Sequence, residues 1–151
     1  MDNRTARIAS VESAGNLEPV AAFNKGRWFT PAFIASHPYV VDKVMKMILA
    51  TSTRGYIGCA RALQKLDYKR HLVRSYPMLF VCGAQDGATP PAVIREITGL
   101  VAGDAIELVD PGAHICNIEN PEGCDTISTS GCRAERAERL FLERPPSSER
   151  S

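Results

Sequence analysis

The sequence predicts an α/β protein in two parts, a string of short helices followed by a strand–helix–strand unit of a parallel sheet. Up to about residue 72, apolar residues recur at helical spacing and no strand pattern is present. Two apolar runs, 77–82 and 104–109, then flank a helical pattern over 92–101, with short connections. Strand, helix and strand in this order are typical of a right-handed parallel βαβ unit. Because two strands cannot bury both faces of a parallel sheet, we expect this unit to be the edge of a larger sheet.

Each expected helix of the first part has a recognisable start or stop. Gly15 ends the first helix and Gly26 the second. Thr30 offers a capping hydroxyl and Pro31 suits the first helical position, so a helix is expected to begin here. His37-Pro38 is expected to end this helix. The expected helices are 6–14, 16–25, a short one from Pro31 to His37, 39–50 and 54–66.

The composition is that of an ordinary soluble protein. The chain has 151 residues, of which 44% are hydrophobic and 23% charged, and its net charge is +1. Basic and acidic residues are nearly equal in number, so the chain lacks the excess of positive charge that nucleic-acid binding requires. No apolar run is long enough to cross a bilayer. The first ten residues are polar, and the five cysteines form no CxxC pair, so we expect reduced thiols and a cytoplasmic location. We expect no cofactor.

The cysteines could in principle form a metal site. Cys116, Cys124 and Cys132 are spaced eight residues apart and lie near His114, but zinc sites normally use tighter ligand pairs from a turn. We therefore expect no metal. Cys59 and Cys82 are interpreted as small buried hydrophobic residues.

The two loops after the expected strands carry the candidate chemistry, because in open parallel sheets working residues gather beyond the carboxyl ends of strands. The loop 83–91 contains Asp86 and the loop 110–121 contains His114. Neighbouring parallel strands would bring these loops side by side. The carboxylate could then accept the Nδ1–H of the imidazole, leaving Nε2 as a general base. Taken singly, Asp86 could be a turn or capping residue and His114 a surface residue. Their joint position at consecutive strand ends favours an acid–base pair.

Several segments resemble the 3-oxoadipate enol-lactonase family, whose members are α/β-hydrolases of the β-ketoadipate pathway for aromatic catabolism. The resemblance runs from about residue 1 to residue 121. It is carried by RWFTPAF (27–33), ATSTRGYIGCARAL (50–63), the spacing Asp67…Leu72…Pro77, CGAQDGATPP (82–91) and PGAHICNIENP (111–121).

The resemblance implies a role for each part of the chain. Asp86 would be the acid and His114 the base of a Ser-His-Asp triad, and the helices of 1–72 would form the cap over the active site. Arg27 and Trp28 would contact the substrate, with the guanidinium pairing with a carboxylate and the indole forming a wall. A surface charge and a residue of the cap core are the alternatives for these two side chains.

The chain departs from the family at its nucleophile. In α/β-hydrolases the serine of a G-x-S-x-G elbow precedes the acid and the histidine. No serine of this chain has glycine at both positions −2 and +2, and no cysteine does. The family's second cysteine in the GYxGCC segment is Ala60 here. The sequence therefore predicts a partial α/β-hydrolase fold, a helical cap plus a C-terminal βαβ unit, with the nucleophile half absent.

We expect three regions: a helical cap region at 1–72, a C-terminal α/β-hydrolase segment at 73–123, and a divergent, disordered tail at 124–151 in which GCDTISTSGC (123–132) interrupts the family's final amphipathic helix. A charged helix around Leu140 could alternatively bind a partner.

Two functions remain open. The first is hydrolysis of a small-molecule lactone, with a complementary N-terminal half supplying the nucleophile. The second is a non-catalytic fragment that binds a partner or a small acid.

Overall fold

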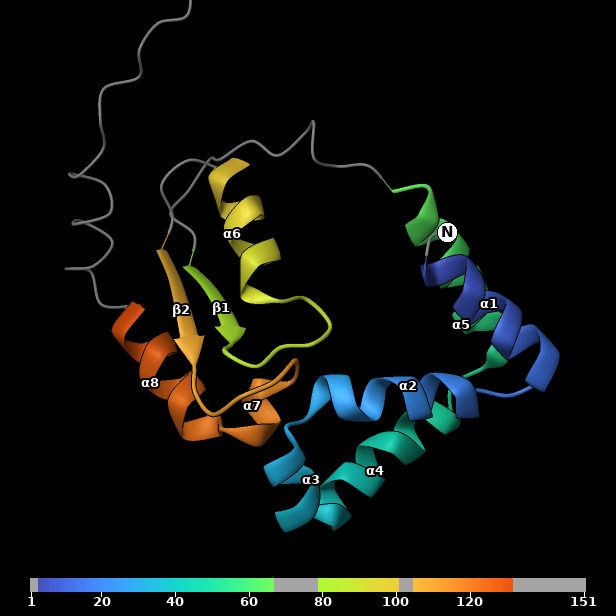
Figure 1. The fold of residues 1–151 in the computed structure, drawn as a ribbon, viewed down its shortest axis with the longest axis horizontal. Coiled ribbons are helices and arrows are strands. Elements are labelled where there is room, and N and C mark those ends of the chain that lie inside the picture. Colours follow the sequence, from blue (N-terminus) through green and yellow to red (C-terminus); the bar gives the residue numbers. More distant parts are fainter. Residues whose placement is uncertain (1–2, 67–78, 101–104, 132–151) are drawn as a thin grey trace, which may run out of the picture.

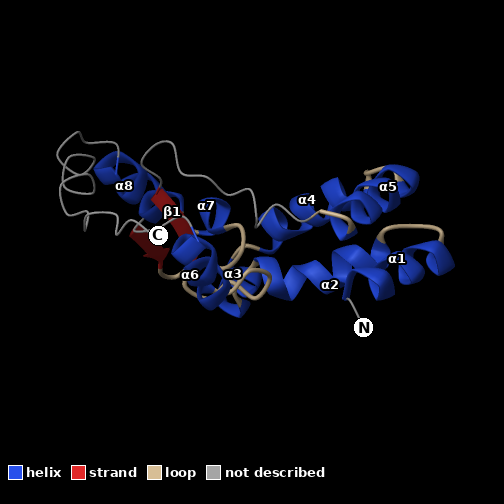
Figure 2. Cartoon of the chain, turned by 90° about the horizontal axis from the view of Figure 1, so that it is seen from above, coloured by secondary structure: helices blue, strands red, loops and turns tan. Residues whose placement is uncertain are grey.

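The computed structural model describes residues 3–66, 79–100 and 105–131. Within them, helices α1 to α5 form one group and a two-stranded sheet with α6, α7 and α8 forms another, as Figures 1 and 2 show. This arrangement confirms the predicted partial α/β architecture. The bounds are α1 Asn3–Ala14, α2 Glu18–Trp28, α3 Pro31–Ser36, α4 Pro38–Leu49, α5 Thr53–Gln64, β1 Leu79–Gly83, α6 Pro91–Leu100, β2 Ala105–Val109, α7 Cys116–Glu119 and α8 Pro121–Gly131.

The cap helices are held by a small apolar core. Val11, Leu17 and Val20 are almost fully buried, and side chains of α4 and α5, including Ile48 and Tyr56, pack against them. A local signal ends α1 where the sequence predicts. Gly15 adopts a φ of 67°, a left-handed conformation that suits glycine, and its N–H donates to the carbonyl of Val11. None of the described helices is long and apolar enough to cross a membrane.

The prediction for α2 is wrong at both ends. The helix begins at Glu18 instead of residue 16, and it continues through Gly26 to Trp28. The side chain of Phe29, which is only 1% exposed, packs inside the protein directly after the helix, and its N–H donates to the carbonyl of Lys25. Burial of the next residue therefore outweighs the roughly 1 kcal/mol that glycine costs inside a helix.

The sheet confirms the predicted βαβ unit. Strands β1 and β2 are parallel and aligned from Leu79 opposite Ala105 to Gly83 opposite Val109. Helix α6 contacts both strands, and so does α8, so that the strands lie between these two helices (Figure 1). The carboxyl ends of both strands point toward the cap, which places the two predicted loops at the junction between the groups.

Helix α8 corrects the prediction for the first part of the tail. Residues 124–131, expected to be turn-rich and disordered, form most of this helix. Its hydroxyl side chains bond back to carbonyls of the preceding turn: Thr126 to Glu122, and Thr129 to Asp125. Contacts with β1 and β2 then stabilise a helix whose polar composition does not predict one. Residues 132–151, including the expected helix around Leu140, lie outside the described residues.

A close approach of backbones at Gly83 joins the two loops. A Cβ built on this glycine would lie 2.0 Å from the carbonyl oxygen of Ala113 and 2.5 Å from that of Gly112. Directly after it, the N–H of Ala84 donates to Val109 and that of Gln85 to Gly112, both at 2.9 Å. The loop after β1 therefore lies against the loop after β2, and only glycine leaves the necessary space.

We predict that Gly83→Ala lowers the free energy of unfolding by about 1–3 kcal/mol, because the new methyl group would contact backbone that cannot move freely. The matched control is Gly58→Ala in α5, where a Cβ meets nothing within 4 Å. That substitution should stabilise the protein by up to about 1 kcal/mol, since alanine is the better helix former. Urea denaturation followed by circular dichroism measures both changes. Equal stability of the two variants would contradict the close approach at Gly83.

Candidate active site

Asp86 lies in the loop after β1, and its two carboxylate oxygens have different partners. Oδ1 accepts hydrogen bonds from the backbone N–H groups of Ala88 and Thr89, at 2.7 and 2.8 Å. Oδ2 lies 2.9 Å from Nδ1 of His114. The side chain is only 6% exposed. Asp86 is thus both a turn residue of its own loop and the partner of His114, two roles that the sequence presented as alternatives.

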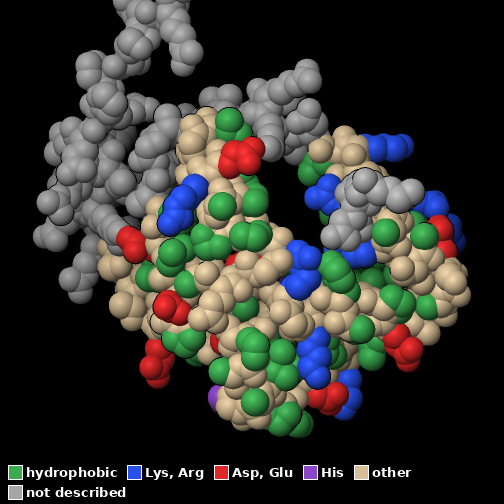
Figure 3. Space-filling view, viewed as in Figure 1, with side chains coloured by type: hydrophobic (Ala, Val, Ile, Leu, Met, Phe, Trp, Pro, Cys, Tyr) green, Lys and Arg blue, Asp and Glu red, His purple; other side chains and the backbone are tan. Residues whose placement is uncertain are grey.

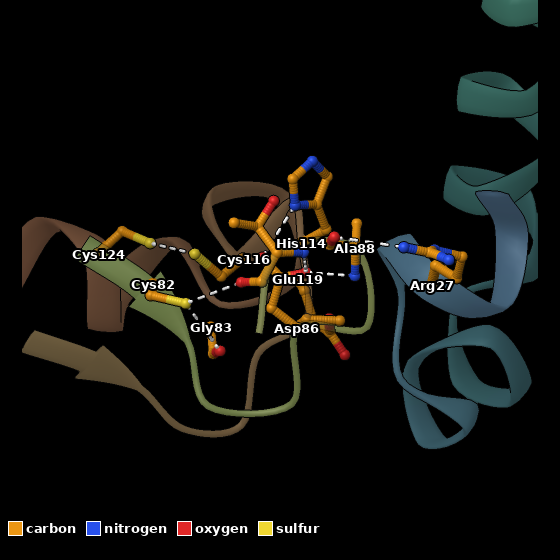
Figure 4. A network of polar contacts seen from close by, with 11 residues as sticks. Arg27, Cys82, Gly83, Asp86, Ala88, His114, Cys116, Glu119 and Cys124 are labelled. Atoms are coloured by element: carbon orange, nitrogen blue, oxygen red, sulfur yellow. Dashed lines mark hydrogen bonds and ion pairs between the residues drawn. The ribbon is translucent and has the colours of Figure 1, made fainter. Parts of the chain in front are cut away.

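His114 follows β2 and faces the cap. Because a carboxylate can only accept hydrogen bonds, its contact with Asp86 requires a proton on Nδ1 and leaves the Nε2 lone pair free in the neutral ring. The side chain of His114 is 35% exposed and lines a cavity, and Figure 4 shows its Nδ1 directed toward Asp86. The structure therefore brings together the two residues predicted as acid and base, in the orientation that a general base requires.

Arg27 and Trp28, the predicted substrate-contacting residues, end α2 beside this pair. The indole ring lies 6.1 Å from the imidazole of His114, measured between ring centres. The Nη2 of Arg27 donates to the carbonyl of Ala88 in the acid loop, at 3.3 Å (Figure 4). The carbonyl of Trp28 accepts the N–H of Ile115. All four predicted site residues thus meet at the junction of cap and sheet.

Glu119, in the short helix α7, fastens this junction, and the sequence analysis missed it. Its carboxylate accepts the N–H of Thr30 at 3.1 Å, the hydroxyl of Thr30, and the N–H of Ala113 at 2.9 Å. It therefore ties the start of α3 to the residue before His114. Thr30 also caps α3, since its hydroxyl accepts the N–H of Phe33. The sequence around Glu119 gives no signal that its partner is Thr30, which lies 89 residues away in the chain.

A cavity of about 320 Å³ opens in front of His114, between the cap and the acid loop. Figure 3 shows a hollow between the α6 side and the α1–α5 side of the molecule, with Lys and Arg side chains at its margin. The volume is within the range of small-molecule sites. Its lining comes from α1, α2, α5 and the two loops: Arg4, Arg7, Asn24, Arg27, Trp28, Tyr56, Cys59, Ala60, Leu63, Ala88 and His114.

The described cysteines are free thiols in different environments. Cys59 is exposed, which corrects the prediction that it is buried, whereas Cys82 is buried as predicted. Burial, together with the negative charge of Asp86, raises the pKa of Cys82. Burial and a hydrogen bond with Cys124 raise the pKa of Cys116 to about 11, the two sulfur atoms lying 3.7 Å apart. Among the described residues, no group of three His, Cys, Asp or Glu side chains could hold a metal ion.

Comparison with known proteins shows what the chain is similar to in sequence and in fold. No protein-family model matches the chain. A curated relative, 3-oxoadipate enol-lactonase 2 of Acinetobacter baylyi, is 35% identical over 118 residues, which are 78% of this chain and 43% of the relative. The crystal structure of a hydrolase from Pseudomonas aeruginosa superposes with a TM-score of 0.74 at 28% identity, covering 87% of this chain and 49% of that one. The chain has part of an α/β-hydrolase fold. It resembles the 3-oxoadipate enol-lactonases.

A second structure agrees in fold. The enol-lactonase of Burkholderia xenovorans superposes with a TM-score of 0.73 at 23% identity, covering 94% of this chain and 51% of that protein. The chain thus spans about half the length of the relatives it matches.

We predict that Glu119→Gln lowers the free energy of unfolding by about 1.5–3 kcal/mol. The amide keeps one accepting oxygen, so at least one charge-assisted hydrogen bond to Thr30 or Ala113 is lost. Glu122→Gln, an exposed position on α8, is the control and should change stability by less than about 0.5 kcal/mol. Urea unfolding followed by the emission of Trp28, the single tryptophan, reports the junction directly. Identical midpoints for the two variants would show that Glu119 does not fasten it.

We also predict a fixed order of thiol reactivity. Alkylation proceeds through the thiolate, so at pH 7.5 iodoacetamide should modify Cys59 at least tenfold faster than Cys82 or Cys116. Because the pKa of Cys116 is about 11, the rate of its modification should rise about tenfold per pH unit from pH 7.5 and level off only near that value. Peptide mass spectrometry measures each rate, and labelling in urea is the control, in which the differences should vanish. Modification of Cys116 as fast as Cys59 in the folded protein would contradict the structure.

Proposed function

We propose that this chain provides the acid, the base and the cap of an enol-lactone hydrolase that works by a Ser-His-Asp mechanism, with 3-oxoadipate enol-lactone of the aromatic-degrading β-ketoadipate pathway as its substrate. The attacking serine comes from a nucleophile-bearing half outside these 151 residues. One observation carries the proposal: His114, oriented by Asp86, faces a cavity of small-molecule size. The similarity to an enol-lactonase supports the choice of substrate.

The arrangement accounts for each proton in the reaction. As the serine oxygen bonds to the lactone carbonyl carbon, its proton passes to Nε2 of His114, and Asp86 stabilises the imidazolium through the Nδ1–H contact. The ring C–O bond then breaks, and the imidazolium gives its proton to the departing enol oxygen, which leaves as the enol of a ketone. Water repeats the sequence on the acyl-enzyme. His114 again acts first as base and then as acid, and the serine is released.

The cap residues would position the substrate. Arg27, held against the acid loop by its hydrogen bond to Ala88, would pair with the substrate's carboxylate. Trp28, beside the imidazole, would form the wall of the pocket next to the lactone ring. Such contacts hold the carbonyl in line with the nucleophile and exclude water from the reacting bond. We propose the cytoplasm as its location, as is usual for a protein with free thiols.

A non-catalytic role is the second candidate. It is favoured by one observation, the absence of G-x-S-x-G from the sequence of this chain. The chain would then bind a small acid in the same pocket without turnover.

The test joins this chain, at Met1, to the nucleophile-bearing N-terminal portion of the Acinetobacter enol-lactonase. We expect the 151-residue chain alone to leave the enol-lactone intact, and the joined protein to hydrolyse it, as followed by loss of the lactone's ultraviolet absorbance. His114→Ala in the joined protein should lower kcat by at least about 1,000-fold, because the base is lost. Glu122→Gln, an exposed position on α8, is the control and should keep full activity.

Each outcome separates the candidates. A folded joined protein without turnover, or turnover that survives His114→Ala, would contradict the assigned acid–base pair and favour the binding role. Turnover by the 151-residue chain alone, abolished by His114→Ala, would instead show that the nucleophile lies within this sequence.

A further inference from the structure

Two cysteines on the far side of the sheet loops lie next to each other. Cys116 begins α7 and Cys124 lies in the first part of α8, and their sulfur atoms are 3.7 Å apart (Figure 4). The bond of a disulfide is about 2 Å long, so each sulfur has only a short distance to move before the two could join. Of the other cysteines in the described part of the chain, Cys82 directs its thiol at backbone carbonyls and Cys59 is exposed on α5.

The turn between α7 and α8 holds this pair in place, and Asn120 is its centre. The N–H of Asn120 donates to the carbonyl of Cys116 at 2.7 Å, and the N–H of Cys124 donates to the carbonyl of Asn120 at 3.2 Å. The side chain of Asn120 donates to the carbonyl of Pro111 at 3.0 Å and accepts the N–H of Gly123 at 2.9 Å. Because the backbone between the two thiols is already ordered, joining them costs little further entropy.

The two thiols differ in their access to solvent. Cys116 is 8% exposed, and its Cβ lies 2.9 Å from the position that a Cβ on Gly112 would take, so its side chain is packed tightly against backbone. Burial raises the pKa of Cys116 to about 11, and at neutral pH it therefore keeps its proton. Cys124 is half-buried on α8. A small oxidant therefore meets Cys124 first, and Cys116 is placed to react with the oxidised sulfur.

We propose that Cys116 and Cys124 form a redox modification site, in which hydrogen peroxide converts the two thiols into a reversible disulfide between α7 and α8. The sulfur of Cys124 loses its proton and attacks one peroxide oxygen. The O–O bond breaks, a sulfenic acid forms on Cys124, and the departing hydroxide takes up the proton to become water. The sulfur of Cys116 then attacks that of the sulfenic acid, the S–O bond breaks, and the hydroxyl leaves as a second water with the proton of Cys116.

The disulfide acts on the loop that carries His114. Cys116 follows His114 by two positions, and the residue between them, Ile115, donates its N–H to the carbonyl of Trp28. Helix α7 also carries Glu119, whose carboxylate joins the cap to the sheet, and α8 contacts both strands. In the oxidised state this loop is therefore tied covalently to the helix that packs on the sheet. The inference goes beyond the proposed hydrolysis and does not depend on it.

The first experiment treats the reduced 151-residue chain with a small excess of hydrogen peroxide, blocks the remaining thiols and identifies the bridge by peptide mass spectrometry without reductant. Cleavage after Glu119 separates the two cysteines, and cleavage before Asp125 separates Cys124 from Cys132. We expect the peptide with Cys116 to be linked to the peptide with Cys124 and to have lost two hydrogen atoms. Dithiothreitol should release the two peptides, since a dithiol returns both electrons and both protons and is itself oxidised to a disulfide.

The second experiment measures what the bridge does. Oxidation should raise the melting temperature of the chain by about 5–10 °C, because a cross-link restricts the unfolded state. Hydrogen exchange at the amide of Ile115 should slow at least about threefold, because local opening of this loop becomes costlier. Both changes should be absent from Cys124→Ser. Cys59→Ser, which removes the exposed thiol of α5, is the matched control and should respond to oxidation as the original chain does.

Three results would overturn the inference. The first is that Cys116 and Cys124 remain free thiols after oxidation of the folded chain. The second is a bridge from Cys124 to Cys132 or to a second chain in place of the one to Cys116. The third is a Cys116–Cys124 bridge that changes neither the melting temperature nor the exchange of Ile115. The peptide analysis uses the unmodified sequence, so it decides between the first two results and the proposal even if Cys124→Ser does not fold.

Discussion

The contact between the cap and the strand ends depends on the carboxylate of Glu119. It accepts the N–H and the hydroxyl of Thr30 on the cap side and the N–H of Ala113 on the sheet side. These contacts lie next to the candidate site residues in the sequence. Trp28 precedes Thr30 by two positions, and His114 directly follows Ala113. The distance between the indole and imidazole rings is therefore held by this carboxylate together with the hydrogen bond from the N–H of Ile115 to the carbonyl of Trp28. Glu119 itself takes no part in the chemistry proposed for the pair.

The sequence predicted the parts of this arrangement that depend on local chain properties. Buried strands, proline-primed helices and glycine-rich loops are visible in composition and spacing, and the parallel βαβ topology follows from their order. The meeting of Asp86 and His114 was predictable for the same reason, because neighbouring parallel strands leave little choice about where their loops lie.

What the sequence could not show arises from contacts between distant residues. In the sequence, Glu119 is one of several acidic residues in expected loops. Its hydrogen bonds with Thr30 depend on the fold, which brings these two distant residues together. From the sequence, Gly26 is predicted to end its helix. The helix continues because Phe29 is buried, and this burial is a tertiary effect that the sequence pattern does not show. Residues 124–131 read as a polar turn because their hydroxyl side chains favour turns unless strands offer a surface for packing. In the sequence, Arg7 resembles any charged residue on a helix surface. Its contact with the ring of Phe23 depends on the packing of α2 beside α1.

The hydrogen bonds of Asp86 explain why the Asp86–His114 pair forms within the sheet and its loops. One of its oxygens is occupied by the backbone of its own loop, at Ala88 and Thr89, and this fixes the orientation of the other toward His114. Gly83 lets the two loops touch, so the pair is held by the sheet and its loops alone. The cap adds a separate element, cationic side chains positioned over an aromatic ring. The Asp86–His114 pair and the arginine side chains are thus built on different segments, and the Glu119 junction holds both segments beside the same cavity.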